Sequence, residues 1–202
     1  MAKRTKKWLW VTPAGHAMYP YLATPDTRYG NDYKVDLVFT GENAKQVKEY
    51  IDSLKDEVEE TLGTKEVSNK IYTAPYIEEE EGNIRLRTKQ KAILVKKTGE
   101  TVEMKVGTFD AKVQPIEPTS IQNGDLIKAE VVLVPYVVGG RWGLTARLKN
   151  VQLLSKSNDT FFNTHFKVEE QYVSEDNPED EDAFKELLGD LEEDLSNDKI
   201  EF

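Results

Sequence analysis

The segment LIKAEVVLVPYVVGGRWGLTARLKNVQLL, residues 126–154, decides the fold class of this chain. Two runs rich in β-branched and other apolar side chains, Leu126–Val138 and Arg141–Leu154, flank the pair Gly139-Gly140. Such runs favour strands, and glycine tolerates the positive φ angles that a two-residue hairpin turn demands. The segment therefore predicts one long antiparallel hairpin.

Alternation along the second run of this hairpin separates a polar face from an apolar face. By this parity Trp142 belongs to the core, although its place beside the turn keeps a ligand contact open. Tyr136 shares its parity with charged and with apolar residues, and we interpret it as facing outward. The polar face holds Arg141, Thr145, Arg147 and Lys149, and the apolar face holds Trp142, Leu144, Ala146 and Leu148.

A strand and a helix are predicted upstream of the hairpin. Residues 33–39 alternate with period two, and the helix is expected over residues 43–62, with a capping box at Asn43 and Gln46 and an end at Gly63. The side chains expected to be buried are Tyr33, Val35, Leu37 and Phe39 from the strand, and Val47, Ile51, Leu54, Val58 and Leu62 from the helix.

The remaining segments predict short strands and turns. Residues 64–83 are interpreted as a loop, and strands are expected at 84–95 and 101–106. Several short strands with one helix between them predict a mainly β protein, either a β-sandwich or an OB-fold, a five-stranded barrel that accepts a helix in a strand connection. The OB-fold with one inserted α-helix is the best single match.

Charge divides the chain of 202 residues into two parts. Residues 1–167 carry 25 Lys and Arg against 22 Asp and Glu, a net charge of +3, whereas residues 168–202 carry 2 Lys against 15 acidic residues, a net charge of -13. So acidic a segment cannot bury enough apolar surface to fold alone. We therefore expect a domain over 1–167 and a disordered acidic C-terminal tail over 168–202.

The end of the tail favours an interaction role over mere solubilisation. The last residues place an aromatic ring beside the terminal carboxylate, which solubility does not require, and apolar residues at helical spacing from Phe184 to Leu195 suit a short helix formed on a partner. Both readings, a solubilising and an interaction tail, stay open on composition. The candidate partner-binding residues are Asp198, Ile200, Glu201 and Phe202.

Motifs for catalysis, cofactors and metals are missing from the sequence. It has no Cys, only two His (His16 and His165), and none of the phosphate-loop, dinucleotide-binding, nucleophile-elbow or zinc-protease signatures. No apolar run approaches the roughly 20 residues of a membrane span. We expect a cytosolic protein that is not an enzyme and holds no cofactor or metal.

Positive charges gather on one face of the strand predicted near residue 84. Alternation places Arg85, Arg87, Lys89 and Lys91 side by side, where they repel unless a polyanion lies across them. Alternatively the face is simply solvated and partly neutralised by the acidic run 78–81.

Aromatic residues are interleaved with cations elsewhere, a combination that binds single-stranded nucleic acid by base stacking and phosphate contact. At the N-terminus Trp8 and Trp10 share a strand face, so a core-packed pair is the alternative. The candidate DNA-binding residues are Lys3, Lys7, Trp8, Trp10, Arg85, Arg87, Lys89, Lys91, Tyr136, Arg141, Trp142, Arg147 and Lys149.

Three stretches, in order, resemble the single-stranded DNA-binding proteins of lytic podovirus-type phages. They are YPYLATPD at 19–26 with YKVDL at 33–37, LIKAEVVLVPY at 126–136 continuing into residues 144–154, and the acidic tail that closes on Phe202. The sequence departs from the family where valines rather than a Trp follow Tyr136. It also carries Lys89, Gln90 and Lys91 where the family has an aromatic residue.

The resemblance implies an OB-fold that coats single-stranded DNA in phage replication, recombination and repair, in the host cytoplasm. It implies that Tyr136 stacks on DNA, and that Phe202 docks on the phage DNA polymerase and primase-helicase. A homodimer is left open. The alternatives are a non-enzymatic assembly or chaperone-like protein with a solubilising acidic tail and, ranked below it, a nuclease on the same fold.

Overall fold

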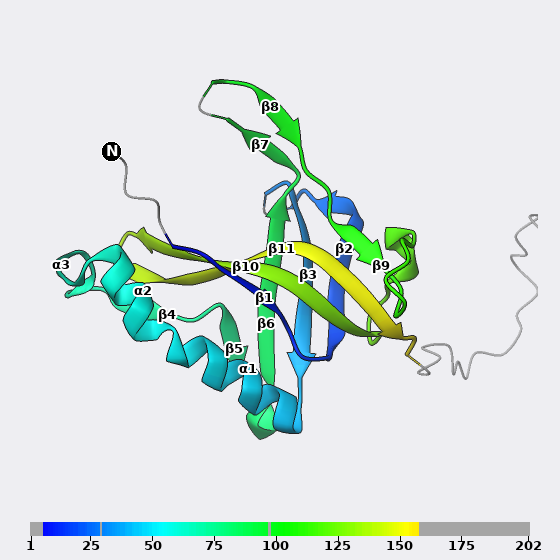
Figure 1. The fold of residues 1–202 in the computed structure, drawn as a ribbon, viewed down its shortest axis with the longest axis horizontal. Coiled ribbons are helices and arrows are strands. Elements are labelled where there is room, and N and C mark those ends of the chain that lie inside the picture. The colour runs from blue at the N-terminus through cyan, green and yellow to red at the C-terminus, as the bar shows by residue number, and fades with distance from the viewer. Residues whose placement is uncertain (1–5, 29, 97, 158–202) are drawn as a thin grey trace, which may run out of the picture. The chain divides into compact units, whose positions relative to one another are not determined.

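Five strands pair in a closed circuit and form a β-barrel (Figure 1). The computed structural model describes residues 6–28, 30–96 and 98–157. In the circuit β2 pairs with β3, β3 with β6, β6 with β11, β11 with β10, and β10 with β2. The predicted OB-fold is confirmed, and a sandwich is not formed. The barrel strands are β2 (Gly15–Asp26), β3 (Asp32–Phe39), β6 (Ile84–Lys91), β10 (Leu126–Val138) and β11 (Arg141–Ser155).

The long hairpin of β10 and β11 forms as predicted. Val138 pairs with Arg141, so Gly139 and Gly140 make a two-residue turn, in which Gly139 takes a φ of 58°. A β-bulge interrupts the ladder after Glu130 and adds one residue to β11. Because of this extra residue, the inward face of β11 changes parity along the strand.

The barrel core is built from the alternate residues of these strands. Three of the four inward side chains predicted for β3, Val35, Leu37 and Phe39, are buried, and Tyr33 is half-buried. Leu86 of β6 and Leu148 of β11 are also fully buried. These apolar faces meet inside the barrel, so the opposite faces of the same strands point outward.

A kinked helical segment links β3 to β6 (Figure 1). It comprises α1 (Gly41–Ser53), α2 (Lys55–Leu62) and the short α3 (Thr64–Val67), and the predicted stripe packs on the barrel. At the kink the Leu54 N–H bonds to the Ile51 carbonyl, at 3.2 Å, instead of one residue further back.

The predicted start of the helix is wrong by two residues. Thr40 is the N-cap, so Asn43 lies inside the helix, where its Nδ2 donates to the Ala14 carbonyl at 2.9 Å instead of making a capping box. The predicted end is confirmed, because Gly63 follows α2 with a φ of 94°. Glycine has a low helix propensity, so the sequence did not indicate that the helix begins at Gly41. A glycine is nevertheless accepted in the first turn.

Residues 64–83, predicted as a loop, contain short elements instead. Besides α3 these are β4 (Ile71–Thr73), β5 (Tyr76–Glu78) and the 3₁₀ turn η1 (Glu80–Gly82). β4 pairs in parallel with β11, and β5 pairs with β6. Strands of three residues are too short to show a period in the sequence, and here the neighbouring strands stabilise them.

The other short elements lie outside the five barrel strands. The expected strand 84–95 breaks at buried Ala92, whose N–H bonds to the Asn31 carbonyl at 2.8 Å. Beyond the break, β7 and β8 form a separate hairpin that projects from the barrel (Figure 1). β1 pairs with β10, and β9 with β11. Their bounds are β1 (Trp8–Val11), β7 (Ile93–Val95), β8 (Thr101–Glu103), β9 (Gly107–Phe109) and, for a second 3₁₀ turn, η2 (Pro118–Ser120).

The chain divides into two units, Met1–Thr160 and Phe161–Phe202. The barrel belongs to the first. The predicted domain boundary after Lys167 and the acidic tail lie outside the described residues, so they stay predictions. Among the helices described, none has the length and apolar character to cross a membrane.

Candidate nucleic-acid interface

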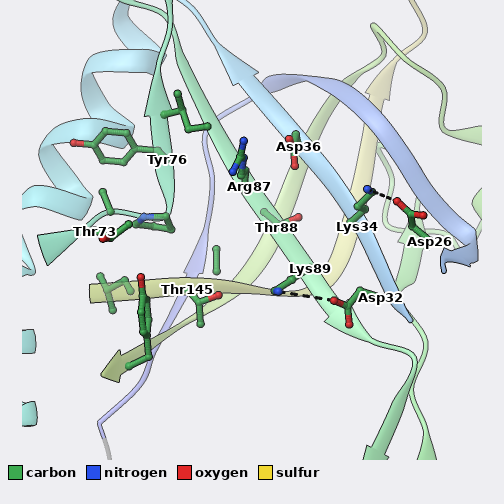
Figure 2. Close-up of a pocket in the computed structure, with 16 residues that line it drawn as sticks. Asp26, Asp32, Lys34, Asp36, Thr73, Tyr76, Arg87, Thr88, Lys89 and Thr145 are labelled. Atoms are coloured by element: carbon green, nitrogen blue, oxygen red, sulfur yellow. Dashed lines mark hydrogen bonds and ion pairs between the residues drawn. The ribbon is translucent and has the colours of Figure 1, made fainter. Parts of the chain in front are cut away.

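A groove of about 880 Å³ runs over the outer face of the barrel, across β3, β6 and β11 (Figure 2). Its floor is the outward face of β3 and β6. Residues 73–77, from the end of β4 into β5, form one wall, and Tyr136 of β10 with residues 144–146 of β11 contribute the rest. The groove is thus built from segments more than a hundred residues apart in sequence.

The strand register sets the charges on the floor of the groove. Lys34 of β3 lies opposite Lys89 of β6, and Asp36 lies opposite Arg87. All four line the groove. Between the two cations of β6, Thr88 turns inward and donates its hydroxyl to the Val35 carbonyl at 2.6 Å, which locks the register of the two strands.

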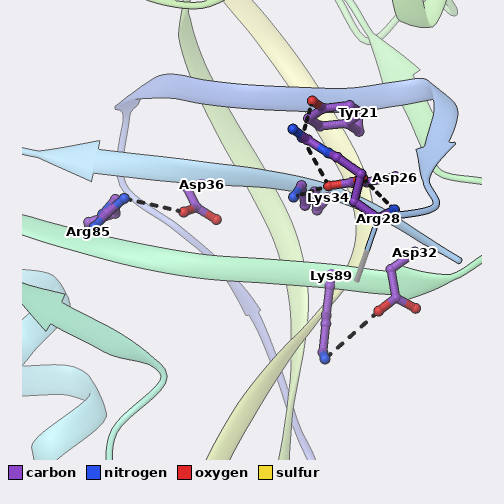
Figure 3. Close-up of polar contacts among 8 residues, drawn as sticks. All are labelled: Tyr21, Asp26, Arg28, Asp32, Lys34, Asp36, Arg85 and Lys89. Carbon is purple, nitrogen blue, oxygen red and sulfur yellow. Dashed lines mark hydrogen bonds and ion pairs between the residues drawn. The ribbon is translucent and has the colours of Figure 1, made fainter. Parts of the chain in front are cut away.

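Carboxylates hold both lysines of the groove floor (Figure 3). Lys34 donates a hydrogen bond to Asp26, and Lys89 Nζ lies 3.8 Å from Asp32 Oδ2. Asp26 and Asp32 also line the groove. The groove therefore presents three lysine or arginine side chains with three aspartates as internal counterions, and an arriving phosphate has to exchange with them.

Asp26 is the most strongly bound of these carboxylates. It is 5% exposed and accepts hydrogen bonds from Arg28 Nε at 3.1 Å and from Lys34. The Arg28 guanidinium, then Lys34 and the Arg28 backbone N–H, hold the pKa of the Asp26 carboxyl well below its usual range. Asp26 is therefore ionised throughout the physiological range and fixes the end of β2 against β3.

Asp36 is in a different environment. Burial raises the pKa of its carboxyl, and the nearby cations Arg85, Arg87 and Lys34 oppose that rise. Arg85 Nη1 lies 3.9 Å from Asp36 Oδ2, while its Nε lies 2.7 Å from Glu79 Oε1. Arg85 is thus engaged on both sides.

The predicted basic face of β6 is present, but its members differ. Arg85 is half-buried and neutralised from the acidic run 78–81, as the alternative reading expected. Arg87, Lys89 and Lys91 are exposed, and only Lys89 of these three makes an ion pair within the described part of the chain. Arg87 and Lys89 lie in the groove, and Lys91 lies just beyond its lining.

Tyr136 stands at the edge of the groove as a half-buried side chain. Trp142, in contrast, is 4% exposed, its Nε1 donates to the Lys70 carbonyl at 3.2 Å, and its ring meets that of Tyr72 edge to face at 4.9 Å. The parity prediction for Trp142 is confirmed. Its ring belongs to the core, so we correct its inclusion among the candidate DNA contacts.

A buried hydroxyl lies behind this aromatic pair. Tyr72 Oη has no hydrogen-bond partner among the residues described. Burial, with contributions from Asp52 and Tyr136, raises the pKa of Tyr72 to about 12. Tyr72 is therefore neutral and acts as packing for the strand that carries the groove wall.

The three cations predicted on β11 lie outside the lining of the groove. Arg147 is exposed and pairs in register with Lys89 of β6. Arg141 is exposed beside the hairpin turn, and Lys149 Nζ lies 3.2 Å from Glu130 Oε1. None of the three lines the groove itself. Arg147 is the one that the register brings beside the floor cations.

The two N-terminal tryptophans lie away from the groove. Trp8 Nε1 donates to Glu57 Oε2 of α2 at 3.0 Å, and the Trp10 ring lies 4.7 Å from that of Tyr50 on α1. Both are half-buried and pack against the core, as the packed-pair alternative expected, and their proposed contact with DNA stays a prediction. Lys7 is exposed. Lys3 and the predicted partner-binding residues Asp198, Ile200, Glu201 and Phe202 lie outside the described residues.

Several groove residues were missed by the sequence analysis. Lys34 carried a signal, because the alternation that buries Val35 forces it outward. Tyr76 and Thr73 carried none, since their segment was predicted as a loop. Tyr76 is fixed by a hydrogen bond from its hydroxyl to Asp52 Oδ1, at 2.7 Å, and burial raises its pKa.

The chemistry of the groove is that of a binding surface. Within residues 6–28, 30–96 and 98–157, no three His, Cys, Asp or Glu side chains are grouped so that they could hold a metal ion. What the groove presents is cationic nitrogen, threonine hydroxyls, and phenol rings along an open channel. These groups suit a flexible anion that carries flat rings.

Comparisons with known proteins find similar structures. No protein-family model and no curated protein sequence matches the chain. The crystal structure of gp2.5, a single-stranded DNA-binding protein encoded by bacteriophage T7, superposes with a TM-score of 0.64 at 22% identity, over 84% of this chain and 100% of that one.

The single-stranded DNA-binding protein from bacteriophage Enc34 gives two further matches. Its complex with single-stranded DNA superposes with a TM-score of 0.56 at 12% identity, over 74% of this chain and 87% of that one. A second Enc34 structure gives a TM-score of 0.52 at 14% identity, over 79% and 87%. The chain therefore shares the fold of phage single-stranded DNA-binding proteins: an OB-like barrel with an inserted helical segment.

Proposed function

We propose that this protein binds single-stranded DNA in the groove over β3, β6 and β11 and that it is not an enzyme. One observation carries the proposal: Tyr136 stands at the edge of a channel whose floor holds Lys34, Arg87 and Lys89. The similar structures are those of single-stranded DNA-binding proteins, one of them in complex with single-stranded DNA. This supports single-stranded DNA as the ligand here.

The binding mode follows from the groups in the groove. Cations contact phosphates irrespective of sequence, and aromatic faces stack on bases irrespective of their identity. Arg87 is exposed and makes no ion pair within the described part of the chain, although it lies opposite Asp36, so it is the floor cation that a phosphate reaches with the least exchange. Lys34 and Lys89 meet one only after leaving Asp26 and Asp32. A duplex hides its base faces, so the groove prefers single strands.

The wider role rests on the acidic segment. We propose that the protein coats single strands during phage DNA replication, recombination and repair in the host cytoplasm. Residues 168–202, with a net charge of -13 and a terminal Phe202, would recruit replication proteins, the phage DNA polymerase and primase-helicase among them. Such a segment would bind a partner protein that presents a basic surface for the carboxylates and an apolar pocket for the Phe202 ring.

The direct test is a set of binding isotherms with oligo-dT and with duplex DNA at two salt concentrations. With about four cations engaged, log K should fall against log[salt] with a slope of about -3. Tyr136→Ala should weaken binding by about 1–3 kcal/mol. The matched control is Tyr19→Ala, because Tyr19 is an exposed aromatic residue outside the groove.

Two outcomes would contradict the proposal. Equal affinity for single and double strands at about 150 mM salt would exclude stacking as the basis of selectivity. An absence of DNA binding in the folded protein would leave the non-enzymatic assembly protein as the better reading of the acidic tail.

A further inference from the structure

The β7–β8 hairpin exposes an apolar face that the barrel does not cover. Ile93 is 45% exposed and Val95 is 65% exposed. They share one face of the hairpin with Glu103, because Ile93 pairs directly with Glu103 in the ladder. Glu103 makes no ion pair with any described residue. The face thus combines two apolar side chains with one unpaired carboxylate.

A second surface, on another part of the barrel, has the complementary character. Beside β1 lies a hollow of about 400 Å³, lined by Trp10, Val11, Pro13, Tyr50 and Lys128 among others. Val11 is 58% exposed. Lys128 makes no ion pair with any residue in the described ranges. The hollow thus combines apolar and aromatic side chains with the polar Thr12 and Gln46 and with one ammonium that makes no ion pair in the described ranges.

The same molecule carries both surfaces, at different places in the fold. Figure 1 shows the β7–β8 hairpin standing out from the barrel, whereas β1 runs across the barrel wall. β1 is also the end of its sheet, with β10 as its pairing partner, so it leaves an edge of backbone groups open for pairing. A contact between two different patches on identical chains repeats without closing and builds a linear array.

We propose that copies of this chain associate head to tail, with the β7–β8 hairpin of one copy seated in the Trp10 hollow and along β1 of the next. Ile93 and Val95 pack on the apolar wall, and Glu103 pairs with Lys128 of the neighbour. The hairpin follows directly after β6, which carries Arg87 and Lys89 of the groove. The proposed contact between copies therefore lies next to the β6 end of the groove. This inference rests on the proposed DNA binding, since the strand aligns the copies.

Charge reversal tests the contact in the full-length protein. Glu103→Lys and Lys128→Glu each place like charges at the junction and should lower affinity for a long oligo-dT, of about 60 nucleotides, by about tenfold. Neither should change affinity for an oligo-dT of about 10 nucleotides that holds one copy. The double variant, Glu103→Lys with Lys128→Glu, restores opposite charges and should recover wild-type binding to the long strand.

Two matched controls separate this effect from net charge and from loss of an apolar side chain. Glu117→Lys makes the same charge change at an exposed site outside both surfaces and should leave the ratio of long-strand to short-strand affinity unchanged. Val95→Ser should lower that ratio, whereas Val113→Ser, at another exposed valine, should not.

The outcomes separate this inference from the proposed function. Failure of the double variant to recover, or equal per-copy affinity of the wild type on short and long strands, overturns the head-to-tail contact. If the hairpin variants weaken binding to the short strand as much as to the long one, the hairpin contacts DNA rather than a neighbour, and the inference is also wrong. If the wild type does not bind the short strand, the proposed function itself fails.

Discussion

Lys34 of β3 and Lys89 of β6 lie directly opposite each other on the groove floor, and a different carboxylate holds each ammonium. Like charges placed across a ladder repel, and Asp26 and Asp32 offset that repulsion. The arrangement holds the two ammonium groups in place on the groove floor. Under the proposed function, the acidic residues of the groove would compete with DNA for these lysines.

Removing one counterion should strengthen DNA binding. Asp32→Asn frees Lys89, which is 64% exposed, from a partner 3.8 Å away. Exposed pairs contribute about 0.2–1 kcal/mol, so affinity for oligo-dT should rise by a factor of about 1.4 to 5 in a fluorescence anisotropy titration. Asp56→Asn, an exposed change on α2 with the same loss of charge, is the control. An equal rise in both variants would point to net charge alone.

Trp142→Ala should destabilise the fold without touching the DNA site. The ring is 4% exposed and donates a hydrogen bond to Lys70, so its removal should cost about 3–5 kcal/mol in urea unfolding. DNA affinity of the remaining folded protein should match the wild type. A variant that stays stable but loses affinity would return the Trp142 ring to the list of DNA contacts.

The stability contributed by Asp26 should depend on pH in one direction. Its folded pKa lies below the ordinary value of 3.8, so the contribution is fully present above that value and is lost as pH falls through the folded pKa. Asp26→Asn should therefore lower the urea midpoint at pH 7, and the difference from the wild type should shrink as pH falls below 4. A difference that stays constant with pH would show that packing, and not the charge, is what Asp26 contributes.

Deleting residues 168–202 should tighten and speed DNA binding. The deletion changes the net charge from -10 to +3, which removes both the overall repulsion of DNA and a tethered polyanion that competes for the groove. The gain should shrink with added salt. Removal of Phe202 alone should barely alter DNA affinity but weaken binding to replication partners, measured by surface plasmon resonance. Lower DNA affinity in the folded truncated protein would contradict this competition.

Residues with a strong local pattern were predicted well. The Gly139-Gly140 turn and the alternation on both sides of it gave the hairpin, and the alternation of residues 33–39 gave the three buried residues of β3. Regular alternation forces each side chain to one face, so a single buried residue places its neighbours.

What could not be predicted depends on contacts between distant segments. β4 and β5 are strands because β11 and β6 lie beside them, and nothing in residues 71–78 alone requires it. The carboxylate partners of Lys34 and Lys89 depend on the register between strands, which no single strand encodes. Trp8 and Trp10 had an ambiguous parity that only the position of the helical segment resolved.

The pairing of β6 with β11 has a consequence for biosynthesis. A nascent chain that has reached only Asp125 holds β2, β3 and β6. It still lacks β10, the pairing partner of β2, and β11, the pairing partner of β6. Closure between strands so far apart in sequence is slow. A product that terminates before β10 therefore lacks the part of the groove that Tyr136 and residues 144–146 line. Such fragments would not compete with the complete protein for its ligand.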